Sequence, residues 1–196
     1  MRRLSVLLCT MALLVLAAGC SEPPQKEIDR AQQGIDAARA AGAEQYAPET
    51  FAAATAALKQ SHEAVDQRDY RLALSRAVDA SDRAQDAARE AADNKAKARR
   101  DTEATINAAN LALMQLDARI KTADAARVPP REIAPARTTA KDAAAALQKA
   151  RAALSADDLA GARTAVDGLD EEIRSEIRVV EAATTLRTVR RPARKR

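Results

Sequence analysis

Residues 70–91, YRLALSRAVDASDRAQDAAREA, decide the fold class of this chain. Their alanines recur at alternating steps of three and four residues, at Ala73, Ala77, Ala80, Ala84, Ala87 and Ala91. That spacing lines one face of an α-helix with methyl groups. Alanine also has the highest helix propensity and the smallest side chain that can be buried. The stretch therefore predicts a long helix that approaches other helices closely.

Apolar residues follow the same heptad-like pattern on both sides of this stretch, and proline and glycine mark the breaks between segments. A further turn is expected at residues 67–69, where Asp69 can cap a new helix, and Ser155 and Asp158 have the spacing of a capping box. We predict five helices, the longest from about Tyr70 to Ala126. Their apolar stripes lie within residues 28–38, 51–65, 70–123, 136–154 and 159–183.

The predicted fold is all-α. It consists of two elongated, antiparallel three-helix bundles that share one long central helix, with coiled-coil-like, alanine-rich packing. We assign the first bundle to residues 27–100 and the second to residues 101–186. The larger leucine, isoleucine and valine side chains gather in the second, which is expected to be the more stable. The charged residues 93–101 interrupt the stripe, which indicates either a solvated part of a continuous helix or a hinge.

Part of the pattern repeats at an offset of 89 residues, which indicates an imperfect duplication. Leu58 corresponds to Leu147, and each leucine precedes the aspartate expected to cap the next helix by eleven residues. The alternative is a chance match, because alanine-rich sequences align easily with themselves.

A second set of motifs lies within residues 27–100. Residues 40–44 read AAGAE, residues 46–48 read YAP, and Leu58 and Asp69-Tyr70 precede the alanine ladder. With these motifs the chain resembles the alanine-rich bacterial envelope proteins of the domain-of-unknown-function family 4398. The resemblance implies a lipoprotein, and some members of the family carry an additional peptidoglycan-binding OmpA-like domain. It implies no catalytic residues.

The N-terminal residues predict export and lipidation. Arg2 and Arg3 precede an apolar stretch that is too short for a comfortable membrane span, which is typical of a signal peptide. The sequence LAAGC, ending at Cys20, resembles a bacterial lipobox, whose cysteine is acylated and becomes the new N-terminus. We therefore assign residues 1–19 to a lipoprotein signal peptide and 20–26 to a lipidated tether. The alternatives are an ordinary secreted protein with a chance cysteine and a twin-arginine signal.

Export of this kind sets the expected location. Ser21, rather than aspartate, follows the cysteine, which by the sorting rule for such lipoproteins implies the outer membrane, facing the periplasm. The only other cysteine, Cys9, belongs to the predicted signal peptide. No thiol is then left for a disulfide, a metal or catalysis in the mature chain.

The residue types required for catalysis are scarce, and we predict that the protein is not an enzyme. The one histidine, His62, stands in the sequence HEAVD, which lacks the second histidine of a zinc-binding HExxH motif. No cofactor or metal is expected. We read His62 as a surface or boundary residue, and Tyr46 and Tyr70 as aromatic plugs at the ends of the first bundle rather than recognition residues.

Charge is distributed unevenly along the chain. The formal net charge is +4, but residues 21–186 hold 24 basic and 28 acidic side chains, and residues 187–196 form a basic tail. The tail is the candidate site for an anionic partner such as peptidoglycan or an acidic envelope protein, and nucleic acid is not expected outside the cytoplasm. A plain solubilising tail is the alternative. The candidate residues are Arg187, Arg190, Arg191, Arg194, Lys195 and Arg196.

These features lead to one functional expectation and one alternative. The first is a lipid-anchored periplasmic structural or adaptor protein, joined to the membrane through Cys20. The alternative is a tetratricopeptide-like helical-repeat module that binds a protein or peptide. The sequence leaves the partner and the oligomeric state open, because alanine seams can pair within one chain or between chains.

Overall fold

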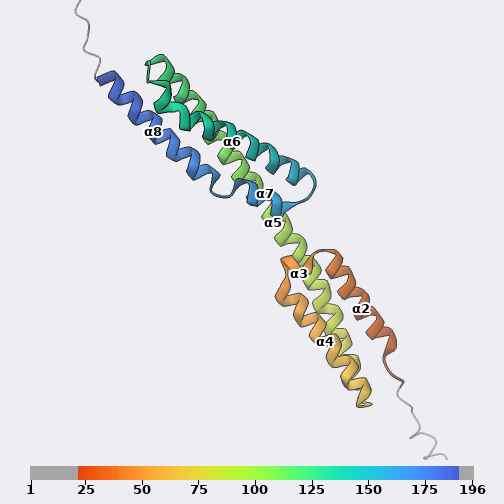
Figure 1. Ribbon diagram of the computed structural model, residues 1–196. Coiled ribbons are helices and arrows are strands. Elements are labelled where there is room, and N and C mark those ends of the chain that lie inside the picture. Colours follow the sequence, from red (N-terminus) through yellow and green to blue (C-terminus); the bar gives the residue numbers. More distant parts are fainter. Residues whose placement is uncertain (1–21, 190–196) are drawn as a thin grey trace, which may run out of the picture. The chain divides into compact units, whose positions relative to one another are not determined.

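The computed structural model describes residues 22–189, and the expected signal peptide, Cys20 and most of the basic tail lie outside that range (Figure 1). Within it the chain forms only α-helices and turns, which confirms the all-α prediction. The predicted long central helix is confirmed as α5, which contains 56 residues. The helices are α2 (Gln25–Ala40), α3 (Ala43–Tyr46), α4 (Pro48–Asp66), α5 (Tyr70–Ala125), α6 (Pro130–Ser155), α7 (Leu159–Val166) and α8 (Leu169–Val189).

The chain divides into two compact units between Lys95 and Ala96, and each contains part of α5. We refer to the residues before this point as unit 1 and to those after it as unit 2. Residues 93–101, where the apolar stripe loses its phase, are helical throughout.

The core of unit 1 is formed by α2, α4 and the first part of α5. Two hydrogen bonds show that α4 and α5 run antiparallel. Thr50 Oγ1 donates to Glu90 Oε2 at 2.6 Å, and the buried Ser61 Oγ donates to the Ala73 carbonyl at 2.8 Å. The following residues of the predicted stripes are all buried: Ile28, Ala31, Ile35, Ala38, Phe51, Ala54, Leu58, Ser61, Ala73, Ala77, Ala80, Ala84, Ala87 and Ala91.

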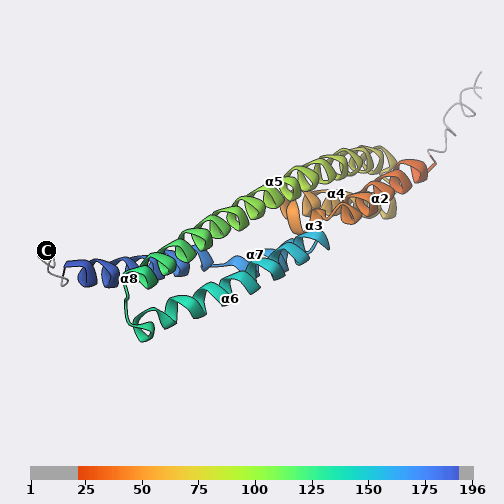
Figure 2. The same ribbon diagram turned by 90° about the horizontal axis from the view of Figure 1, so that it is seen from above.

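Close contact between α2 and α5 explains why the buried face of this part of α5 consists of alanines. A Cβ built at Gly34 would lie 3.3 Å from the Ala84 Cβ, so the two backbones have almost no side chain between them. Within unit 1, α2 and α5 begin at the same end and run in the same direction (Figures 1 and 2). A larger residue at either position would have to push the helices apart.

The connection between α2 and α4 contains one more element than the sequence indicated. Gly42, with φ of 86°, ends α2 as expected, and Pro48 begins α4. Between them the short helix α3 turns the chain, and its Ala43 is buried. Asn94 Nδ2 donates a 2.7 Å hydrogen bond to the Tyr46 carbonyl and joins this corner to α5.

The core of unit 2 is formed by the second part of α5 together with α6, α7 and α8. Arg137 Nη2 contacts Asp124 Oδ2 at 2.6 Å, and Arg151 Nη2 donates to Asn110 Oδ1 at 2.9 Å, which shows that α5 and α6 are antiparallel. Besides several alanines, this core buries larger side chains: Ile106, Leu116, Ile120, Ile133, Leu147, Ile173 and Val180.

Two local predictions for unit 2 are wrong. One helix was expected from Leu159 onward, but the chain breaks at Asp167-Gly168 into α7 and α8, and Gly168 has a left-handed φ of 67°. Ser155 was expected in a capping box, but its hydroxyl donates to the Ala152 carbonyl. Asp158 caps α7 alone by accepting from the Gly161 N–H at 2.8 Å.

The 89-residue offset relates positions with similar burial in the two units. Asp69 caps α5 through the Leu72 N–H, as Asp158 caps α7. Where unit 1 buries Ala80 and Ala84, unit 2 buries Leu169 and Ile173. The two cores therefore share a pattern but differ in side-chain volume.

Three turns between helices contain a non-glycine residue in the left-handed conformation. Arg68, Arg127 and Asp157 each have φ of 60°. At the first turn, the Asp69 N–H donates to the Ala64 carbonyl and the Arg68 N–H to the Val65 carbonyl, which is the Schellman pattern. Glycine is favoured at this position, since a Cβ is strained there.

Substituting Arg68 with glycine is therefore expected to raise the free energy of unfolding by about 1 kcal/mol. Chemical denaturation monitored by circular dichroism would measure the change. The matched variant Gln85→Gly, at an exposed interior position of α5, is expected to lower it by about 1 kcal/mol. Equal losses in the two variants would contradict the role assigned to the turn.

Candidate interaction surfaces

The structure describes one of the residues singled out as candidate sites. Arg187 lies exposed in the last turn of α8. Cys20 lies outside the described residues. So do the remaining cations of the tail, which are Arg190, Arg191, Arg194, Lys195 and Arg196. Their assigned roles stay predictions.

An exposed apolar stripe runs along the outer face of α8, opposite the core. We call Val179, Ala182, Leu186 and Val189 the α8 outer stripe. Their 3-4-3 spacing places them on one face of the helix, while Ile173 and Val180 face the core. The exposed fractions of Val179, Leu186 and Val189 are 51%, 61% and 78%.

A second exposed apolar surface lies on the outer face of α5 in unit 2. Residues 104–116 contain no charged side chain, although one face of this segment points to solvent. Leu111 and Met114 are 60% and 62% exposed. We call Ala104, Leu111, Met114 and Ala118 the α5 outer stripe; all four are exposed.

Sequence reasoning missed both stripes, although their spacing was available. The sequence analysis expected a single apolar face on each helix. In α5 and α8 the core-facing residues already provided that face, so the second series was not considered. A second heptad-like series on the opposite face was the signal, since a helix packed on one side should carry polar residues on the other.

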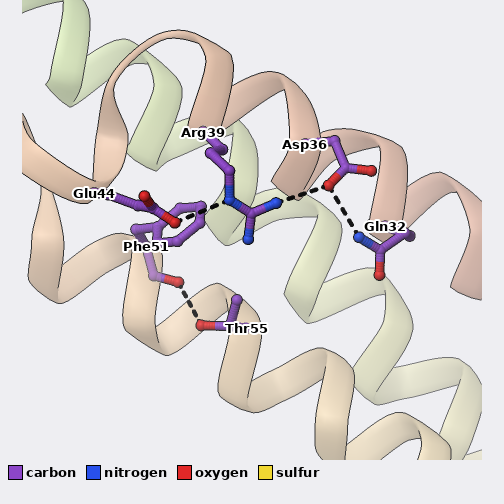
Figure 3. Close-up of polar contacts among 6 residues, drawn as sticks. All are labelled: Gln32, Asp36, Arg39, Glu44, Phe51 and Thr55. Atoms are coloured by element: carbon purple, nitrogen blue, oxygen red, sulfur yellow. Dashed lines mark hydrogen bonds and ion pairs between the residues drawn. The ribbon is translucent and has the colours of Figure 1, made fainter.

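A polar cluster lies at the corner where α2 meets α3 and α4 (Figure 3). Arg39 Nε donates to Glu44 Oε1 at 2.9 Å, and Arg39 Nη1 donates to Asp36 Oδ1 at 3.0 Å. The Arg39 guanidinium carbon also lies 5.4 Å from the centre of the Phe51 ring, within the range of a cation–π contact. These contacts join the three helices and point to a structural role.

The same contacts raise the pKa of Arg39. The hydrogen bond that Arg39 donates to Glu44 is the largest cause that raises the pKa of Arg39 above its ordinary value, and the charges of Glu44 and Asp36 add to it. Arg174 behaves similarly, because its hydrogen bond with Asp170 raises the pKa of the guanidinium. Neither arginine can serve as a proton donor or acceptor near neutral pH.

The residues that the sequence analysis assigned to surface or structural roles are also described. His62 is exposed on α4, while Tyr46 and Tyr70 are half-buried, and Tyr46 packs against the core of unit 1. No group of three or more potential metal ligands occurs among residues 22–189. Over the same residues, none of the helices combines the length and the apolar character that a membrane span requires.

Comparisons with known proteins add no relative. No family model, no curated protein and no solved structure matches the chain. The resemblance of residues 27–100 to the domain-of-unknown-function family 4398 therefore stays a prediction.

Proposed function

We propose that the protein is a lipid-anchored structural or adaptor protein of the bacterial cell envelope, held to the outer membrane through Cys20 and facing the periplasm. The observation that carries this proposal is the LAAGC sequence ending at Cys20, placed after a short apolar stretch. The first helix of the described residues, α2, begins at Gln25, only five residues beyond that cysteine. Acyl chains on Cys20 would therefore hold unit 1 close to a membrane.

The architecture that goes with this function is a pair of antiparallel three-helix bundles that share α5, elongated and with coiled-coil-like alanine seams. The buried residues of unit 1 come mainly from α2, α4 and α5, with Ala43 of the short helix α3 added. In unit 2, α7 and α8 together would form the third helix beside α5 and α6. The contact of Gly34 with Ala84 supports close alanine packing in unit 1. Bundles of this kind suit a spacer or adaptor whose outer surfaces contact partners.

The basic tail supplies one such surface. Six of the last ten residues are Lys or Arg, and none is acidic. An anionic partner in the envelope, such as peptidoglycan or an acidic protein, would be attracted to these charges at short range.

Replacing Cys20 is expected to abolish lipidation. Wild-type protein should incorporate a labelled fatty acid, fractionate with membranes and begin at an acylated cysteine when its N-terminus is analysed by mass spectrometry. Cys20→Ala should incorporate no label and leave the membrane fraction or persist as an uncleaved precursor. Cys9→Ala is the matched control and should behave as wild type. An unmodified thiol at residue 20 of the mature wild-type protein would contradict the proposal.

The alternative function is a helical module that binds a protein or peptide partner, as tetratricopeptide-like repeats do. The α5 outer stripe favours it, because the uncharged segment 104–116 presents Leu111 and Met114 to solvent and could receive the apolar face of a partner helix. A photo-crosslinking residue at position 111 that captured one defined envelope protein in cells would support this alternative over a purely structural role.

A further inference from the structure

The α5 outer stripe faces away from the core of unit 2. Leu111 and Met114 lie on the opposite side of α5 from the buried Leu116 and Ile120, and they are 60% and 62% exposed. No residue from 104 to 116 carries a charge. A helix that packs on one face is expected to carry charged residues on the other, so this face has the composition of a second packing surface.

The α5 outer stripe is symmetric about Leu111. Ala104 and Ala118 lie seven residues before and after it, and therefore on the same face of the helix at equal distances. If a second copy of α5 packs on this face in the antiparallel direction, Leu111 meets the partner's Leu111, and Ala104 meets the partner's Ala118. Arg100, which continues the face toward the N-terminus, falls opposite the partner's Thr122, which is uncharged.

The charged residues that flank the stripe fit the same pairing. Two acidic residues precede it, Asp101 and Glu103, and two basic residues follow it, Arg119 and Lys121. Asp101 and Arg119 share one edge of the stripe, and the other pair shares the opposite edge. In an antiparallel pair the same edge of both helices comes together with the ends reversed, so Asp101 meets the partner's Arg119. Glu103 likewise meets the partner's Lys121. A parallel pair would place acidic residues beside acidic and basic beside basic.

These four side chains are accessible for contacts between copies. Asp101 and Lys121 are exposed, and neither forms an ion pair within residues 22–189. Glu103 and Arg119 each make one ion pair within the chain, at 3.1 and 2.8 Å, yet their side chains remain 45% and 53% exposed. The flanking charges therefore select a second copy of this chain, in one direction and one register, as the occupant of the stripe.

We propose that the α5 outer stripe binds the same stripe of a second copy, antiparallel, with the two-fold axis at Leu111. Such an interface is isologous, because both chains contribute the same surface. The inference goes beyond the proposed function and requires neither an acyl chain on Cys20 nor the basic tail. A contact of this length between two helices falls at or below the roughly 1,200 Å² of a standard interface, so the dimer should be weak and reversible.

Cysteine crosslinking tests the direction and register. The parent is the expected mature chain, residues 20–196, with Cys20→Ser, which contains no cysteine. In the proposed dimer, Cys introduced by Ala104→Cys lies close to Cys introduced by Ala118→Cys in the partner. Each lies roughly 21 Å along the helix axis from its own equivalent, beyond the reach of a disulfide. Mixing the two variants under mild oxidation should therefore give at least about fivefold more linked dimer than either variant alone.

Sedimentation equilibrium tests the side chains of the interface. The parent should show a dimer fraction that rises with concentration, and Leu111→Gln/Met114→Gln should weaken dimerisation about tenfold. Val179→Gln/Leu186→Gln on the α8 outer stripe is the matched control, since these side chains are 51% and 61% exposed, and it should dimerise like the parent. Both variants keep the charge and a good helix-forming residue at each site, so circular dichroism should show equal helix content.

Several results would overturn the inference. Parent chain that stays monomeric at about 0.5 mM would do so, because even a weak dimer forms at that concentration. Linked dimer that forms as readily within each cysteine variant as in the mixture would exclude the antiparallel register. Dimerisation that survives Leu111→Gln/Met114→Gln undiminished would place the interface elsewhere. The acylation of Cys20 is measured separately, so either proposal can fail while the other stands.

Discussion

Leu116→Ala is expected to lower the free energy of unfolding of unit 2 by about 3 kcal/mol. Leu116 is 0% exposed and is among the largest fully buried side chains of the described residues. Much of the surrounding core is alanine, including Ala109, Ala112 and Ala123, and such short side chains cannot move in to fill the space. The loss should therefore include both the transfer of the leucine side chain and the cavity that remains.

Hydrogen exchange measured by mass spectrometry is the appropriate readout, because the two units need not unfold in one transition. Peptides from α6 and α8 should lose protection in Leu116→Ala. Leu111→Ala is the matched control: Leu111 lies on the same helix but is 60% exposed, so little change is expected. Equal loss of protection in the two variants would show that the core does not depend on Leu116.

Ala84→Leu is expected to destabilise unit 1 by about 3 kcal/mol, for the opposite reason. Ala84 is 0% exposed, and its Cβ lies where Gly34 allows α2 to approach α5. Three additional carbon atoms at this point cannot be accommodated unless α2 moves away, which would expose Ile28, Ala31 and Ile35. At the corresponding position of unit 2 the chain holds Ile173, so the effect depends on the spacing of the helices rather than on the hydrophobicity of the residue.

The same exchange experiment tests this prediction. Peptides of α2 and α4 should lose protection in Ala84→Leu, while those of α6 and α8 keep it. Ala92→Leu, at an exposed position of α5, is the control and should be close to neutral. A fully protected α2 in Ala84→Leu would mean that the contact between α2 and α5 is looser than the distance at Gly34 indicates.

The sequence predicted the inner faces of the helices well, for a physical reason. The alanine side chain is a single methyl group and has no polar or catalytic role of its own. Alanines placed at steps of three and four residues therefore indicate which face of a helix packs against its neighbours. The stripe of α2, from Ile28 to Ala38, and the ladder from Ala73 to Ala91 are buried as expected. Val65 and Tyr70, at the ends of two stripes, are only half-buried, so burial becomes incomplete before the sequence pattern ends.

The breaks in the helices were harder to predict because they depend on single backbone conformations. Gly168 interrupts an apolar pattern that continues in phase from Val166 to Leu169, so periodicity alone favoured one helix. The positive φ value of Arg68 has no signal in residue type, because arginine is not a residue that this conformation favours. Asp157 gives only a weak signal, since aspartate adopts this conformation occasionally. These turns are imposed by the packing of the helices that they join.

The candidate sites were only partly predictable. The positive charge of the tail can be counted from the sequence. The α8 outer stripe can be recognised as solvent-exposed only once Ile173 and Val180 are known to face the core. Leu186 could have been assigned to either face from the sequence.

The division of α5 between two cores has a consequence for how the chain is degraded. If a protease removed the helices of one unit, the part of α5 that belonged to it would lose every tertiary contact and would be marginally stable as a lone helix. Digestion would then proceed along α5 until it reached residues still packed in the surviving unit. Partial proteolysis should yield fragments that end near the middle of α5 rather than at the turns between helices.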